Sequence, residues 1–96
     1  MNPFTDEHIG AGASPTDSAE MIAIAAITHI AASERLLGRF LDLSGLTVAD
    51  LRAGVDTPDV QRAALDFLAA HEPDLLACAQ DTGIAPADIA AARAAL

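Results

Sequence analysis

The chain has 96 residues, the length of one domain, and its only aromatic residues are three Phe. Its net charge is −9, with 14 acidic residues against five basic ones, all of them Arg. Such a surface repels phosphate backbones and anionic lipids, which excludes a generally basic nucleic-acid or membrane-surface protein. The single cysteine, Cys78, excludes an internal disulfide and fits a reducing compartment.

The first segment, residues 1–13, contains one Pro and two Gly among few large apolar side chains. We predict that it is a mobile tail. It lacks the basic start of a secretory signal, and the apolar run at 21–32 is too short to span a bilayer. We therefore expect a cytoplasmic protein that does not enter a membrane.

Three helices are predicted in the first half of the chain. Each begins at a residue whose side chain can accept a hydrogen bond from a free backbone N–H group: Ser14, Ser33 and Thr47. The first continues from Pro15 to about residue 32, the second ends at Gly45, and the third ends near Gly54.

The second half carries similar signals with different residues. Its helices are predicted to begin at Thr57-Pro58, Glu72-Pro73 and Ala85-Pro86, because Pro is tolerated in a first helical turn. Gly83 ends the second of them, and the last reaches about Leu96. No segment alternates with the period of two that a strand requires, so no strand is expected.

The two halves also repeat in sequence. Residues 22–51 and 60–89 align without a gap at a constant offset of 38, and identical pairs include Glu34/Glu72, Gly45/Gly83 and Asp50/Asp88. Repetition of this size is typical of stacked helical units. We predict an all-α fold: a compact bundle of about five to six short helices in one domain, 14–96, built from two tandem three-helix pseudo-repeats, 14–55 and 56–96.

No set of residues for catalysis, cofactor binding or metal binding is recognisable. The recurring carboxylates Glu34/Glu72 and Asp50/Asp88 could suggest acid–base or metal sites. All four fall in predicted first turns, however, where a carboxylate interacts with free N–H groups and the helix dipole. We therefore predict a protein that is not an enzyme and that holds neither cofactor nor metal.

The histidines and the cysteine are likewise interpreted as structural. The spacings of His8, His29 and His71 match no compact metal-ligand motif. His29 aligns with a Phe, which predicts a packing role for it. His71 aligns with a capping Ser, which predicts that it stands at a cap position. Cys78 aligns with Phe40, a predicted core position, and has no basic neighbour that would favour its thiolate.

The glycine turns at Gly45 and Gly83 resemble the joint of a helix-turn-helix motif. A helix that reads DNA needs Arg, Lys, Asn or Gln side chains to reach base edges. The two candidate helices offer only Arg52 and Arg93. We therefore expect no nucleic-acid partner, and a helix-turn-helix-like, DNA-linked regulator is the alternative function.

The two sequence repeats differ in the polarity of their first helices. Three positions are Ala23, Ile24 and Thr28 in one copy and Gln61, Arg62 and Asp66 in the other. The first helix is thus predicted to be apolar on a side that its counterpart keeps polar. Such a helix is either central in the core or covered by a partner.

If a partner covers the first helix, the candidate face is Met21, Ile24 and Thr28. The predicted function is then that of a non-enzymatic protein–protein interaction module, which either binds another protein or associates with itself.

Two runs of sequence are more specific than alanine-rich helix. They are ERLLGRFL at 34–41, followed by SGL at 44–46 and DLR at 50–52, and DFLAAHEPDLL at 66–76. They resemble a family of small bacterial all-helical proteins classed as a domain of unknown function, over about residues 17–96. The resemblance implies the helical class and the domain boundaries, and it implies no activity, cofactor or catalytic residue.

Overall fold

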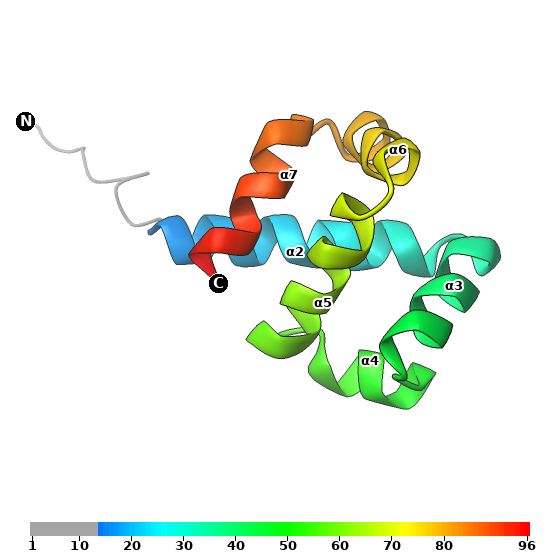
Figure 1. Ribbon diagram of the computed structural model, residues 1–96. Helices are drawn as coiled ribbons and strands as arrows, with labels where there is room; N and C mark the ends of the chain where they lie inside the picture. The colour runs from blue at the N-terminus through cyan, green and yellow to red at the C-terminus, as the bar shows by residue number, and fades with distance from the viewer. Residues whose placement is uncertain (1–13) are drawn as a thin grey trace, which may run out of the picture.

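The computed structural model describes residues 14–96, so the predicted tail lies outside the described residues. All regular structure in this part of the chain is helical, which confirms the all-α class. The elements are α2 (Pro15–Ala31), α3 (Glu34–Ser44), α4 (Val48–Gly54), α5 (Pro58–Ala69), α6 (Glu72–Thr82), α7 (Pro86–Ala92) and the 3-10 turn η2 (Arg93–Ala95) (Figure 1).

Capping side chains set the starts of the helices in the first half. The backbone N–H of Asp17 donates to the hydroxyl of Ser14 at 3.0 Å, and the Asp17 carboxylate accepts from the N–H of Ser14. Thr47 and Asp50 form the same reciprocal pair at the start of α4. These capping boxes satisfy backbone donors that a helix otherwise leaves free, as the sequence predicted.

The helix boundaries recur at the offset of the sequence repeat. α3 and α6 begin and end 38 residues apart, and so do α4 and α7. Gly45 and Gly83 end α3 and α6 with φ of 77° and 76°. Gly adopts this left-handed conformation without steric cost, which is why both helices stop there. That the halves superpose as two three-helix units stays a prediction.

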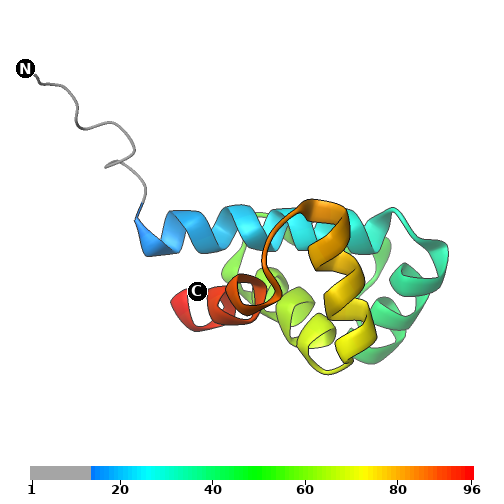
Figure 2. The same ribbon diagram turned by 90° about the horizontal axis from the view of Figure 1, so that it is seen from above.

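α2 is the central helix of the fold. α3, α5, α6 and α7 all contact it, and from above most of the other helices lie to one side of it (Figure 2). The third helix of each half packs on the first helix of the other half, α4 on α5 and α7 on α2. The two halves therefore contribute to one hydrophobic core.

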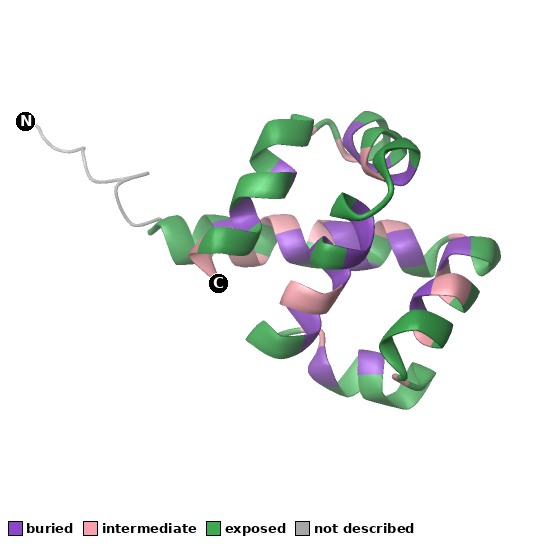
Figure 3. Cartoon of the chain, viewed as in Figure 1, coloured by how far each residue is buried: buried purple, intermediate pink, exposed green. Residues whose placement is uncertain are grey.

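Buried and exposed residues alternate along α2 with the helical period (Figure 3). Its core side is built from Ala19, Ala23, Ala26, Ile27 and Ile30. No single helix among residues 14–96 has both the length and the apolar character of a membrane span. α2 and α3 pass that test only as a pair, and they are bent by 113° relative to each other.

Replacing two glycines that lack a positive φ by alanine should change the free energy of unfolding in opposite directions. A methyl group on Gly54 would overlap Cγ2 of the buried Val60, so Gly54→Ala should lower the free energy of unfolding by about 1–2 kcal/mol. Around Gly38, in mid-α3, the described residues leave open space, so Gly38→Ala should raise it by about 0.5–1 kcal/mol. Urea unfolding checks both variants, and effects of the same sign would contradict this packing.

Candidate functional site

The predicted partner face on α2 is exposed. Met21 and Ile24 are 73% and 40% exposed, and Thr28 is exposed as well. The Thr28 hydroxyl donates to the carbonyl oxygen of Ile24 at 2.9 Å, so its polar group is occupied within the helix. We call these three residues the α2 stripe. α2 is therefore central in the fold on one side, and no other part of residues 14–96 covers this stripe.

The positions 38 residues later form a charged stripe on α5: Asp59, Arg62 and Asp66. Arg62 pairs with Asp59 and also donates to the carbonyl oxygen of Leu96 at 3.3 Å. Asp66 accepts from Nε of Arg93 at 2.9 Å. The same helix positions are thus charged and paired within the chain on α5, but largely apolar on α2.

Gln61 corrects one sequence prediction. It is 1% exposed, and its counterpart Ala23 is fully buried, so neither belongs to a solvent-facing polar side. Nε2 of Gln61 donates to the carbonyl oxygen of Val55 at 3.1 Å, whereas Oε1 has no hydrogen-bond partner among the described residues. Because alignment alone does not show which way a side chain points, the sequence placed Gln61 on the wrong side.

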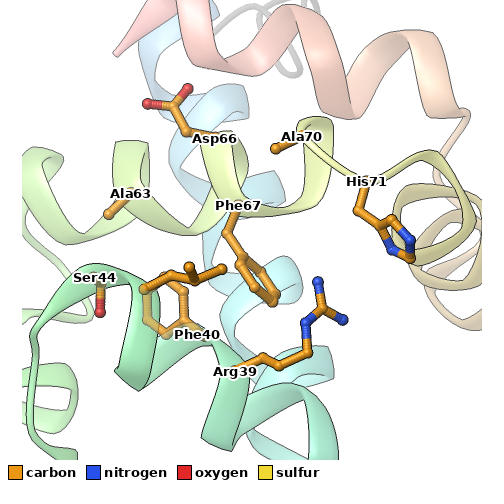
Figure 4. A pocket seen from close by; sticks show the side chains of 9 residues that line it. Arg39, Phe40, Ser44, Ala63, Asp66, Phe67, Ala70 and His71 are labelled. Carbon is orange, nitrogen blue, oxygen red and sulfur yellow. The ribbon is translucent and has the colours of Figure 1, made fainter.

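A groove of about 420 Å³ lies between α3 and α5 (Figure 4). Its floor contains Phe40 and Phe67, whose rings meet edge to face with centroids 5.3 Å apart. Leu43 lines the groove and is 74% exposed, although it is a large apolar side chain. The sequence predicted Phe40 as a core position and gave no sign of a cavity beside it.

One end of the groove is charged. Asp74 is 4% exposed, and its Oδ2 lies 2.9 Å from both Nη1 of Arg39 and Nδ1 of His71. The Arg39 guanidinium also lies 5.1 Å from the centroid of the Phe67 ring. Burial raises the pKa of Asp74, but hydrogen bonds and positive charge from His71 and Arg39 outweigh it, so the pKa lies below its ordinary value.

The chain matches one known protein family. Residues 16–96 match the model of one family, described as Protein of unknown function (DUF3572). The chain belongs to this family. No curated protein and no solved structure matches it. The matched span contains both the α2 stripe and the groove, and it confirms the resemblance to a domain of unknown function noted in the sequence.

The remaining candidate residues of this DUF3572 chain are dispersed. Nδ1 of His29 lies 2.8 Å from Oδ2 of Asp81, while His71 contacts Asp74, and His8 lies outside the described residues. Cys78 is buried, as predicted from its alignment with Phe40. Burial, together with the negative charge of Asp81, raises the pKa of the Cys78 thiol, so the reactive thiolate is disfavoured.

The recurring acidic residues of the DUF3572 chain lie at helix starts, and among the described residues only Asp50 of the four makes a capping hydrogen bond. Glu34, Asp50, Glu72 and Asp88 all stand in first helical turns, as the sequence predicted. His71 precedes α6 but makes no side-chain capping bond, because its ring is engaged by Asp74. Of the two arginines of the helix-turn-helix joints, Arg52 is exposed and Arg93 is paired with Asp66.

Proposed function

We propose that this DUF3572 protein is a non-enzymatic protein–protein interaction module that associates with a second copy of itself through the α2 stripe. The observation that carries the proposal is the 73% exposure of Met21 on a helix that is otherwise central to the core. Burying a side chain of this kind contributes about 1.5–3 kcal/mol, so a partner covering the stripe gains substantially.

The uncharged stripe makes a second copy possible as that partner despite the net charge. Two molecules that each carry −9 repel each other over most of their surfaces. The stripe residues are uncharged, so a contact between two stripes brings no like charges of the stripe itself together. A twofold axis through the stripe would bring the same residues together from both copies, as symmetric dimers require. The charged α5 stripe, already paired within the chain, supports no such contact.

The internal repeat supplies the test. The triple variant Met21→Asp, Ile24→Arg and Thr28→Asp transfers the residues of the α5 stripe to the equivalent positions of α2. Because α5 carries these residues at the same helical spacing, the variant should fold. In sedimentation velocity, the wild-type protein should shift from monomer to dimer as concentration rises, and the triple variant should stay monomeric.

Leu76→Asp is the matched control, because Leu76 is 49% exposed on α6 and lies outside the stripe. This variant should dimerise like the wild-type protein. A wild-type protein that stays monomeric at high concentration, or a triple variant that dimerises equally well, would contradict the proposal.

The alternative function, a DNA-linked regulator, has less support. Of the two arginines at the helix-turn-helix-like joints, Arg93 already pairs with Asp66. A mobility shift with duplex DNA at low salt, lost steeply as salt is added, is the result that would favour it.

We also propose a cytoplasmic location, which the lone thiol of Cys78 supports; recovery of the native protein in another cell fraction would contradict it.

A further inference from the structure

By the sequence repeat, the packing of α3 on α5 corresponds to that of α6 on α2, where two equivalent residues are polar. Phe67 corresponds to His29, and Leu43 corresponds to Asp81, each 38 positions away. His29 and Asp81 bridge α2 and α6 at 2.8 Å. In the groove, by contrast, Leu43 is 74% exposed beside an empty volume of about 420 Å³. Phe67 contacts Phe40 of α3 instead, and Leu43 is left exposed beside the groove where its counterpart Asp81 makes a cross-helix contact.

The charged end of the groove also departs from its counterpart. Asp74 corresponds to Leu36, and both are 4% exposed. Burying a carboxylate costs free energy where a leucine would gain it, unless hydrogen bonds compensate. Here the compensation comes from Arg39 and His71, which stand where the other half has Ala77 and Ser33. The result of burying Asp74 is that two nitrogen-bearing side chains are held side by side at the groove.

These two side chains keep further nitrogen atoms for a ligand. Among the described residues the Arg39 guanidinium hydrogen-bonds only to Asp74, through Nη1, which leaves Nε and Nη2. The His71 side chain is half exposed, and Asp74 engages only its Nδ1, so Nε2 donates a hydrogen bond to a ligand when the ring is protonated. Figure 4 shows Arg39 and His71 at the same end of the groove, with the Phe67 ring beside Arg39 and the Asp66 carboxylate directed away.

We propose that this groove binds a small monocarboxylic acid with an aliphatic or aryl body. The body would lie along Phe40, Phe67 and Leu43, and the carboxylate would accept hydrogen bonds from Arg39 and, when its ring is protonated, from His71. A guanidinium suits a carboxylate in both charge and planar geometry. The volume of about 420 Å³ lies within the range of small-molecule sites. An amine fits less well, because Asp74 is engaged by two donors and Asp66 is paired with Arg93.

The probes are octanoate, 1-octanol and octylamine, which share an aliphatic body and differ in the head group. Calorimetric titration of the whole protein should show that octanoate binds about tenfold or more tightly than octanol, because a hydrogen bond to a charged group adds that much. Octylamine should bind no better than octanol. Failure of octanoate to bind, or equal affinity for octanoate and octanol, would overturn the proposal.

Variants locate the two parts of the site. Arg39→Gln should weaken octanoate binding about tenfold or more and leave octanol unchanged, and Arg39→Lys should recover part of the loss. Ala70→Leu should weaken both ligands, because Ala70 lines the groove and is exposed enough to accept a larger side chain without unfolding. Leu76→Asp and the α2-stripe triple variant should bind octanoate normally. Wild-type affinity in both Arg39→Gln and Ala70→Leu would contradict the assignment.

Discussion

Phe40→Ala should lower the free energy of unfolding by about 3–5 kcal/mol, a large part of the 5–15 kcal/mol typical of a whole domain. Phe40 is 1% exposed and meets the Phe67 ring edge to face at 5.3 Å. Removing the ring loses its burial, its aromatic contact and the support that it gives α3 against α5. Urea unfolding at neutral pH, followed by circular dichroism, measures the loss.

Phe40→Leu is the control for this prediction. It keeps an apolar side chain of similar reach, so it should cost clearly less, about 1.5 kcal/mol or below. A loss of less than about 1 kcal/mol for Phe40→Ala would mean that this position collapses easily or is not a core position, against the packing described above.

Asp74→Asn should lower the free energy of unfolding by about 1.5–3 kcal/mol at neutral pH, because the buried carboxylate accepts from two donors that carry or can take positive charge. Asn keeps the shape but loses the charge. Arg39 and His71 remain accessible to water, which keeps the cost below that of a fully buried pair.

The difference in unfolding free energy between the wild-type protein and Asp74→Asn should depend on pH. The pKa of Asp74 is lowered from 3.8 in the folded chain, so its contribution is complete above that ordinary value. The contribution is lost as pH falls through the lower, folded value, where the wild-type carboxyl also becomes neutral. The stability gap between wild type and Asp74→Asn should therefore shrink from about pH 7 to about pH 2.5. A gap that stays constant or widens on acidification would contradict the account.

Much of the fold was predictable because its signals are local. Ser14 and Thr47 with their partners at the third position cap helices whatever lies elsewhere in the chain. Gly45 and Gly83 stop helices by a backbone conformation that other residues rarely adopt. For the same reason the predicted helix ends fall within a residue or two of the observed ones, apart from the final turn, which tightens to a 3-10 turn after Ala92.

The candidate sites were predictable only in part. The α2 stripe could be identified because helical spacing places Met21, Ile24 and Thr28 on one face. The cluster at Asp74 could not, since Arg39 lies 35 residues away and only tertiary packing of α3 against the α5–α6 corner joins them. One signal did exist in the sequence: Asp74 occupies the repeat position of Leu36, a charge at a core site.

We propose that an apolar stripe on α2, and not a reactive set of side chains, provides the function. Backbone amide NMR shifts of the wild-type protein, followed over a concentration series, test it most directly. We predict concentration-dependent shifts confined to α2 around Met21, Ile24 and Thr28 and their immediate neighbours. Spectra that do not change with concentration, or changes centred on α4 or α6, would contradict it.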